Sequence, residues 1–265
     1  MKKSGFTLAE ILISLTIIGI IASLTIPPLI SESQREIAAK RLSSAVSAIE
    51  TGFTNAIMAE GKQDLSETTL WSQGALNYLA SADQRKTFAG NLGRYMILGG
   101  YKNSVADVYN GATVSALAND GSRGNTITDT AEWGIPIELK NGAFFFITTY
   151  VRGASDNLGS VLTEDQAAAL GTSLKYAIAM VYIDVNGNSS PNIVGRDIFG
   201  FFMGDNGILY PVGSKDVSVY LTNADGLYWN HDSASNWFAC TNSLKSGNAF
   251  GCTARLIENN YNMNY

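Results

Sequence analysis

Side chains that carry oxygen recur at alternate positions in one segment, where Asp184, Asn186 and Asn188 precede Asp197. Carboxylate and amide oxygens are the ligands that Ca²⁺ takes in proteins, and this spacing is similar to the first half of a calcium-binding loop. The segment is not an EF-hand, because no glycine stands at the sixth position and Gly195 occupies the twelfth, where glutamate is needed. An Asx-rich turn between two strands would use the same side chains to bond nearby backbone groups. The sequence leaves both interpretations open, and calcium is the one cofactor that it suggests.

The chain has two cysteines, Cys240 and Cys252, and neither lies in a CxxC motif or a His/Cys cluster. This pattern argues against a zinc site. A disulfide is the natural pairing if the residues lie outside the cytoplasm, and two buried free thiols are the alternative. A disulfide would close a loop of about a dozen residues, worth roughly 2–3 kcal/mol.

The side chains of this sequence give little support to a catalytic function. His231 is the single histidine, so any nucleophile activated by histidine would depend on it. Its neighbours Trp229, Asn230 and Asp232 are typical of a loop. We therefore expect no enzymatic activity and no catalytic residues.

Glu10 is the only charged residue between Phe6 and Ile30. Those 25 residues would span about 37 Å as a helix, enough to cross a hydrocarbon core of ~30 Å. A carboxylate in such a helix costs roughly 2.5–3.5 kcal/mol at mid-bilayer, and less near the interface. Lys2 and Lys3 before the span favour an N-terminus in the cytoplasm, while Arg35, Lys40 and Arg41 on the far side weaken this signal. A carboxylate kept at this cost is a candidate for a functional role.

The segment Lys2-Lys3-Ser4-Gly5-Phe6-Thr7-Leu8-Ala9-Glu10 closely resembles the processing site of type IV prepilins and type II secretion pseudopilins. In that family a membrane peptidase cuts after the glycine and methylates the new N-terminal amine. The resemblance implies cleavage between Gly5 and Phe6, N-methylation of Phe6, and a role in filament assembly for Glu10, whose proposed partner is the methylated amine of a neighbouring subunit. Gly19 and Pro27 stand where many pilins have a helix-loosening glycine and a kinking proline. The two cysteines resemble the stapled C-terminal region of many type IV pilins.

The N-terminus admits two other interpretations. A secretory signal peptide should have an apolar region of 7–15 residues ending in a small-residue cleavage site, and this run is longer and carries an acid. A plain membrane anchor in which Glu10 is incidental is the second.

The resemblance implies a structural subunit of a type IV pilus or a type II secretion pseudopilus. Its expected partners are other subunits, the prepilin peptidase, the inner-membrane assembly platform and, before assembly, membrane lipid. The expected location is the inner membrane with the head outside, followed by a periplasmic or extracellular filament. The alternative is a minor pilin displayed on a filament as an adhesin or a DNA-uptake module. The formal net charge of −5 becomes −7 once Lys2 and Lys3 are removed, which argues against broad nucleic-acid binding.

The elements that would position these residues begin with one long bent helix. Its apolar part covers residues 6–30, after the leader 1–5, and its amphipathic part covers 31–62. Pro27 and Pro28 lack an N–H and should kink or open the helix, and Gly61 should end it. An apolar stripe in the second part steps at helical spacing: Leu42, Val46, Ile49, Phe53 and Ile57.

Residues 63–265 are expected to form a globular head of the α+β, pilin-like class. Helices are predicted over 64–79 and 83–95, loops and short elements over 101–142, and an antiparallel sheet of three to five strands. The predicted strands are 143–151, 177–185, 197–203 and 208–212, with a turn at 204–207 before the last.

Aromatic residues gather in two groups. Phe144–Phe146, Phe199 and Phe201–Phe202 fall in predicted strands, where core packing is expected. A second group near the cysteines could form either an adhesive surface or packing around a disulfide: Trp229, Trp237, Phe238 and Tyr261.

Overall fold

The computed structural model describes residues 7–72, 81–118, 123–128, 130–148, 177–214, 240 and 249–263. The chain divides into two compact units, residues 1–37 and 38–265. Helix α1 (Leu8–Glu60) contributes its first part to one and its last part to the other. We call residues 38–265 the globular unit.

In the first unit α1 is apolar and solvent-exposed. Its large aliphatic side chains are about half to three-quarters exposed, up to 77% for Leu8. The helix continues without a break through Pro27 and Pro28, and Ser31 Oγ donates to the carbonyl of Pro28 at 2.9 Å. A bend at Gly19 or at the prolines stays a prediction.

In the globular unit α1 is amphipathic, as its spacing predicts. Leu42, Ile49 and Phe53 are fully buried, and Val46 and Ile57 pack against the same core. Small residues before and between them are buried as well, which lets the sheet approach the helix closely: Ala38, Ala39, Ala45, Gly52 and Ala56.

The end of α1 at Gly61 is confirmed. Gly61 has φ +63° and donates to the carbonyl of Met58, while Lys62 N donates to the carbonyl of Ile57. This is the Schellman arrangement, in which a glycine in the left-handed region satisfies the last helical carbonyls.

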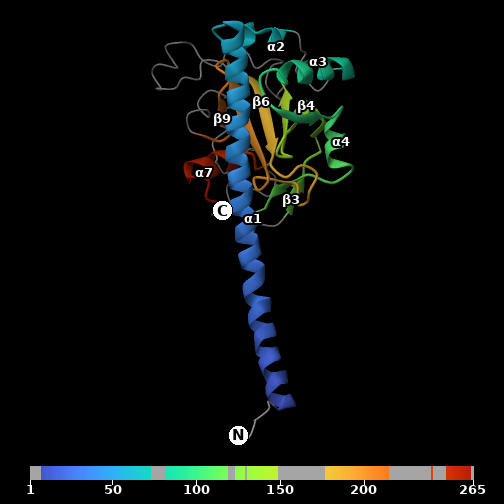
Figure 1. Ribbon diagram of the computed structural model, residues 1–265, viewed down its shortest axis with the longest axis vertical. Helices are drawn as coiled ribbons and strands as arrows, with labels where there is room; N and C mark the ends of the chain where they lie inside the picture. The colour runs from blue at the N-terminus through green and yellow to red at the C-terminus, as the bar shows by residue number, and fades with distance from the viewer. Residues whose placement is uncertain are drawn as a thin grey trace, which may run out of the picture. The chain divides into compact units, whose positions relative to one another are not determined.

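Nine strands form one sheet in the described part of the globular unit, in the order β1-β4-β5-β6-β8-β7-β2-β3, with β9 paired to β8. Figure 1 labels β3, β4, β6 and β9 among them. The strands are β1 (Leu98–Tyr101), β2 (Ser115–Leu117), β3 (Arg123–Thr126), β4 (Ile135–Leu139), β5 (Phe144–Thr148), β6 (Ala177–Asp184), β7 (Ile193–Val194), β8 (Ile198–Gly204) and β9 (Leu209–Pro211).

The α+β, pilin-like class is confirmed. The sheet has nine strands, more than the three to five predicted, and it is not purely antiparallel. β2 pairs with β7, and β7 with β8, in parallel, so the sheet is mixed. The segment 101–142, predicted as loops and short elements, supplies β2, β3 and β4. Three of the four predicted strands match β6, β8 and β9, and β5 covers the described part of the fourth.

The helical elements of the globular unit are short apart from α1. The helix predicted over 64–79 begins as η1 (Leu65–Glu67) and α2 (Thr69–Ser72), and residues 73–80 lie outside the described ranges. The one predicted over 83–95 is α3 (Ala82–Leu92), which starts with a capping box between Ser81 and Gln84. The others are α4 (Val105–Tyr109), η2 (Thr130–Trp133) and α7 (Cys252–Glu258).

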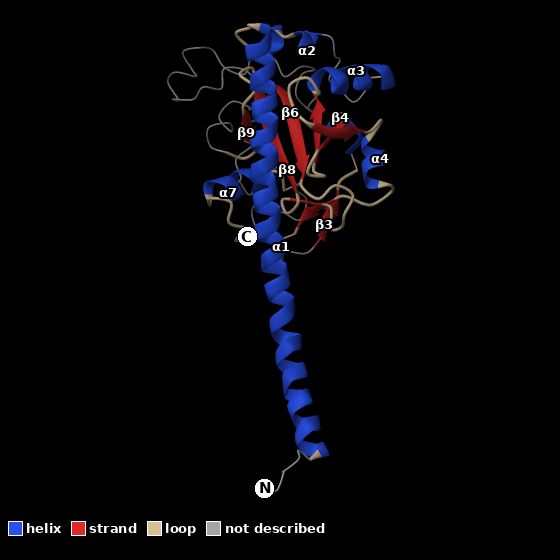
Figure 2. Cartoon of the chain, in the orientation of Figure 1, coloured by secondary structure: helices blue, strands red, loops and turns tan. Residues whose placement is uncertain are grey.

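The sheet buries both faces. One face packs against α1, which crosses in front of β6 and β8 in Figure 2. The opposite face is covered by α4, Trp133, Phe250 and the disulfide region. Alternation along β5 and β8 divides the phenylalanines between the two faces, because successive side chains of a strand point to opposite sides. Phe145, Phe199 and Phe201 face α1, and Phe144, Phe146 and Phe202 face the other core.

Candidate functional site

Glu10 forms a capping box with Thr7 at the start of α1. Glu10 Oε2 accepts from Thr7 N and from Thr7 Oγ1, each at 2.8 Å. Thr7 Oγ1 in turn accepts from Glu10 N at 3.3 Å. The carboxylate thus satisfies the backbone N–H of Thr7, the Thr7 hydroxyl satisfies that of Glu10, and the carboxylate has partners within its own chain. Sequence reasoning gave Thr7 no role, although the Thr-x-x-Glu spacing is the signature of this cap.

The helix that carries Glu10 is the one candidate for a membrane span in the described parts of the chain. Its length and composition fit an anchor, and its apolar window has no buried residues. An exposed apolar surface of this kind needs lipid or another protein to cover it.

A comparison with family models identifies the N-terminal pattern. The model of the prokaryotic N-terminal methylation motif matches residues 1–26. The chain carries a prepilin-type signal. This signal is that of type IV pilins and pseudopilins, and it fits a membrane-anchored, pilin-like subunit. No curated protein and no solved structure matches the chain. Gly5 and Phe6 lie outside the described residues, so the cut and the methylation stay predictions.

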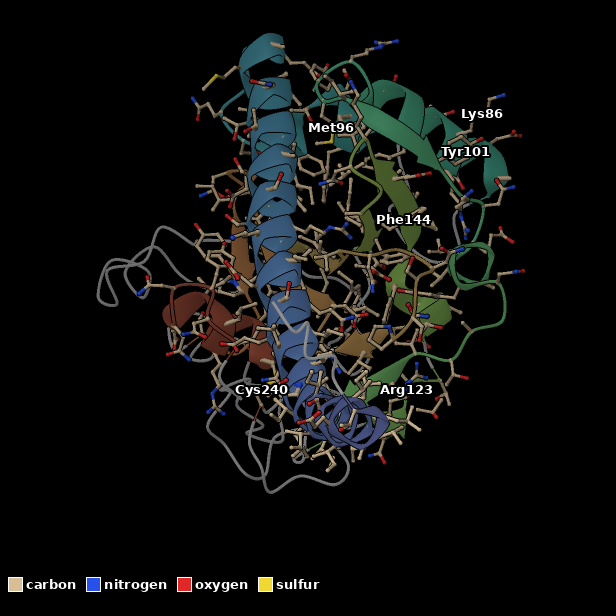
Figure 3. The ribbon with its side chains drawn as sticks, turned by 60° about the horizontal axis from the view of Figure 1, so that its bottom comes forward. Lys86, Met96, Tyr101, Arg123, Phe144 and Cys240 are labelled. Carbon is tan, nitrogen blue, oxygen red and sulfur yellow. A yellow bond between two sulfur atoms is a disulfide. The ribbon has the colours of Figure 1, made fainter. Side chains whose placement is uncertain are left out.

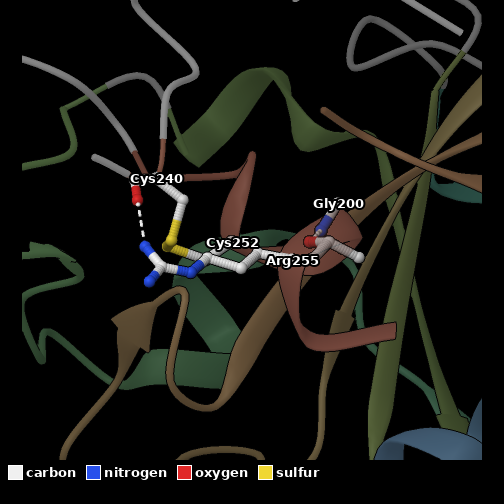
Figure 4. The surroundings of a disulfide bond; sticks show 5 residues. Gly200, Cys240, Cys252 and Arg255 are labelled. Atoms are coloured by element: carbon white, nitrogen blue, oxygen red, sulfur yellow. Dashed lines mark hydrogen bonds between the residues drawn. A yellow bond between two sulfur atoms is a disulfide. The ribbon is translucent and has the colours of Figure 1, made fainter. Parts of the chain in front are cut away.

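The predicted disulfide is confirmed between Cys240 and Cys252, with an S–S distance of 1.99 Å (Figure 4). Arg255 Nη1 donates to the carbonyl of Cys240 at 3.1 Å. The buried Thr253 Oγ1 accepts from Gly200 N at 2.9 Å, which anchors α7 to β8. The disulfide thus links Cys240 to the sheet through α7.

The aromatic group predicted near the cysteines is described only in part. Tyr261 packs against the core on the α1 side. Trp229, Trp237, Phe238 and His231 lie outside the described residues.

The segment from the end of β6 to the start of β8 brings three of the four predicted calcium ligands together, namely Asp184, Asn186 and Asp197. Asp184 Oδ1 accepts from Asn186 N at 3.0 Å and Gly187 N at 2.8 Å. Asn186 Nδ2 donates to Asp197 Oδ2 at 3.0 Å. Asn188, by contrast, is exposed.

Asp197 is committed to the backbone of its own turn. Its Oδ2 accepts from Asn192 N at 2.9 Å, and its Oδ1 accepts from Ile193 N at 2.5 Å. Burial raises the pKa of Asp197. Burial, followed by the charge of Asp197, raises the pKa of Asp184 well above its usual range. Most contacts of the Asp184 and Asp197 carboxylates are with nearby backbone N–H groups, as the Asx-turn interpretation predicts.

Two oxygens of this loop are left over. Asp184 Oδ2 and Asn186 Oδ1 are buried and make no hydrogen bond of ordinary geometry, although the Tyr109 hydroxyl lies close enough to Asp184 to oppose the rise in the pKa of its carboxyl. In the described residues no group of three or more His, Cys, Asp or Glu side chains could hold a metal. A cation here would therefore need amide, hydroxyl and main-chain oxygens beside the one free carboxylate oxygen, a donor set that suits Ca²⁺ and not Zn²⁺.

Proposed function

We propose that this chain is a structural subunit of a type IV pilus or a type II secretion pseudopilus. The observation that carries the proposal is the N-terminal methylation motif over residues 1–26. It is supported by the apolar first half of α1, the pilin-like α+β globular unit and its C-terminal disulfide. A signal of this type points to a structural subunit and not to an enzyme.

The subunit works in two environments. As a precursor it sits in the inner membrane through α1, with the globular unit outside. After cleavage the exposed aliphatic side chains of α1 leave the lipid and pack with the same helices of other subunits. Burial of apolar surface contributes ~25 cal/mol per Å² where the alternative is water.

Glu10 specifies how the helices align during this passage. In a filament core without water, a helix register that leaves the Glu10 carboxylate without a cationic partner is strongly unfavourable. The methylated amine of Phe6 in a neighbouring subunit would supply that partner. The capping contacts from Thr7 keep the carboxylate hydrogen-bonded until then. The other partners of this pathway are the prepilin peptidase and the assembly platform.

The proposal is tested by the mass of the mature protein. Expressed with an active prepilin peptidase, the chain should begin at Phe6 and carry one added methyl group. A Gly5→Val variant should stay uncut, while Ser4→Ala, beside the junction, is the matched control and should be cut. A mature chain that still begins at Met1 would refute the proposal.

A further inference from the structure

The sequence contains four Asn-Gly pairs, and all four lie in the described residues: 110–111, 141–142, 186–187 and 206–207. Asparagine is a thermolabile residue, and a glycine after it has no side chain to hinder attack by its backbone nitrogen on the amide. That attack requires an asparagine side chain that is free to turn and a glycine N–H that is not already bonded. The native contacts of each pair therefore decide whether it can react.

The pair Asn141 and Gly142, in the turn between β4 and β5, is exposed but hydrogen-bonded at both residues. Asn141 Oδ1 accepts from Ala143 N at 3.1 Å. Gly142 N donates to the carbonyl of Leu139 at 2.9 Å. Both bonds must break before Gly142 N can reach the amide, so exposure alone does not make this pair reactive.

The pair Asn186 and Gly187 is held by the two aspartates around it. Asn186 Nδ2 donates to Asp197 Oδ2 at 3.0 Å. Gly187 N donates to Asp184 Oδ1 at 2.8 Å, and Gly187 is buried. Neither reacting group is free in the native state.

The pair Asn206 and Gly207, in the turn between β8 and β9, is held in a similar way. Asn206 Nδ2 donates to the Tyr210 hydroxyl at 3.1 Å, and Asn206 Oδ1 accepts from Ile208 N at 3.0 Å. Gly207 is buried, and its N–H donates to the carbonyl of Gly204 at 3.0 Å. Reaction here would require the whole turn to open.

Asn110 and Gly111 differ from these three pairs. They follow α4, which Figure 1 labels, and both are exposed. Asn110 N caps the helix by donating to the carbonyl of Ala106, but in the described part of the chain the Asn110 side chain and Gly111 N make no hydrogen bond. No atom lies within 4 Å of a Cβ built at Gly111. The two reacting groups are therefore free and have open space around them.

The backbone at Asn110 also leaves room for the reaction. Asn110 has φ 46° and ψ 43°, in the left-handed region that residues other than glycine seldom occupy. Rotation about ψ moves Gly111 N relative to the Asn110 amide. This rotation gives up the turn bond from Ala112 N to the carbonyl of Tyr109, but it breaks no bond of the reacting atoms themselves.

We propose that Asn110 is a site of spontaneous deamidation in the native protein. Gly111 N loses its proton to base and attacks Asn110 Cγ; a C–N bond forms, and Asn110 Nδ2 takes up a proton and leaves as ammonia. Water then opens the cyclic imide at either carbonyl, which gives aspartate or isoaspartate. The net reaction consumes water and releases ammonia, and it needs no enzyme and no oxidant.

The modification should weaken the packing of α4. Its product places a negative charge at the C-terminal end of the helix, where the helix dipole is already negative. Isoaspartate also adds a carbon atom to the backbone. Because α4 buries Val105, Val108 and Tyr109 in the core on the sheet face opposite α1, conversion should lower the melting temperature of the globular unit.

The experiment follows all four pairs in one sample. The full-length protein, purified in detergent, is kept in mildly alkaline buffer below its melting temperature and analysed by peptide mapping and mass spectrometry. The peptide that contains Asn110 should exchange NH₂ for OH first, and an isoaspartyl methyltransferase should label it. The other three pairs should react roughly tenfold more slowly or less, because their hydrogen bonds must break first. In urea all four should react at similar rates.

Two variants connect the modification to stability. Asn110→Gly has no amide and suits the left-handed region, so its melting temperature should not fall during an incubation that lowers that of the wild type. Asn141→Asp, at the exposed but bonded pair, is the matched control, and it should lose melting temperature at the wild-type rate.

Three outcomes would overturn the proposal. A native protein that keeps Asn110 intact while all four pairs react in urea would show that the fold protects this pair too. Faster conversion of Asn141 than of Asn110 would show that exposure, and not hydrogen bonding, decides the site. A melting temperature that falls equally in Asn110→Gly would assign the loss of stability to another part of the chain.

Discussion

The carboxylate of Glu50, on α1, accepts a hydrogen bond from the backbone N–H of Leu209, at the start of β9, over 3.0 Å. This contact joins α1 to the edge of the sheet across 159 positions of sequence. Glu50 is half-buried, and burial raises its pKa above the usual 4.5 even though the Leu209 N–H opposes the shift. The native state therefore holds the Glu50 proton to higher pH than the unfolded chain does.

The sign of the pH effect follows from this difference. Where the native state binds more protons than the unfolded state, the free energy of unfolding falls as pH rises. The wild type should lose stability relative to Glu50→Gln as pH rises from 4.5 through the raised pKa of Glu50. Denaturant melts of both proteins across this range measure the difference. A difference that stays constant with pH would show that Glu50 is ordinarily solvated.

Glu60, near the end of the same helix, should show the opposite slope. Its carboxylate accepts from Thr69 N at 2.6 Å and from Thr69 Oγ1 at 2.7 Å, and the backbone contact is the main cause of its lowered pKa. The stabilisation is present above pH 4.5 and is lost as pH falls through the lowered pKa. Glu60→Gln should therefore cost stability near neutral pH and little in acid. Equal costs at both pH values would contradict this.

The sequence predicted the elements whose signal is local. The stripe from Leu42 to Ile57 and the glycine at 61 act within one or two helical turns, so the amphipathic helix and its end could be read directly. Long apolar runs such as Phe144–Thr148 predicted strands for the same reason. The Thr7–Glu10 cap was equally readable from its spacing.

Other features depend on contacts between distant segments. Strands β2 and β3 have only three and four residues, and β3 contains a glycine and exposed polar side chains. No alternation of apolar and polar residues marks either strand. Their pairing comes from neighbours such as β7, which no local pattern reveals. Tyr109 illustrates the same limit in the core, because its ring packs with Trp133 and Phe146 and nothing near it in sequence indicates these contacts.

Gly52 gives α1 room to pack against Met96. A Cβ at Gly52 would lie 1.9 Å from Met96 Cε and 2.9 Å from Met96 Cβ, and Met96 is labelled beside α1 in Figure 3. Gly52→Ala should destabilise the globular unit by about 1–3 kcal/mol, because Met96 must leave its place in the core. Thermal and denaturant melts measure this loss.

Gly90, in the interior of α3, is the matched control. No atom lies within 4 Å of a Cβ built there, so Gly90→Ala should be neutral or stabilising by about 0.5–1 kcal/mol through helix propensity. If both alanine variants stabilise the protein, the close approach at Gly52 is not restrictive.

The Cys240–Cys252 disulfide should contribute measurably to stability. It closes a loop with a sequence separation of 12, and a loop of this size is worth roughly 2–3 kcal/mol. The Cys240→Ser, Cys252→Ser double variant should lose about this amount. Reductant should bring the wild type close to the variant and leave the variant unchanged. Quantitative thiol labelling of the unreduced native protein would instead show that the bond does not form.

Glu10→Ala should separate assembly from folding. The globular unit consists of residues 38–265, so its thermal melt should not change when Glu10 is replaced. Membrane insertion should be intact or improved, because the variant no longer places a carboxylate in an apolar helix. Entry into filaments should fall, because the amine of Phe6 in the neighbouring subunit loses its counter-charge. The measurement is the yield of sheared filaments beside the amount of subunit in whole cells.

Thr7→Val is the control that isolates the cap. It removes the hydroxyl donor to Glu10 Oε2 and leaves the Thr7 backbone donor and the carboxylate in place. If the intermolecular charge pair sets the register, Thr7→Val should retain far more filament yield than Glu10→Ala, because the cationic partner of Glu10 remains. Equal losses in the two variants would assign the effect to the start of the helix. Equal yields of Glu10→Ala and wild type at equal expression would make the carboxylate incidental, and the chain would then be better described as a membrane-anchored protein with a prepilin-type signal.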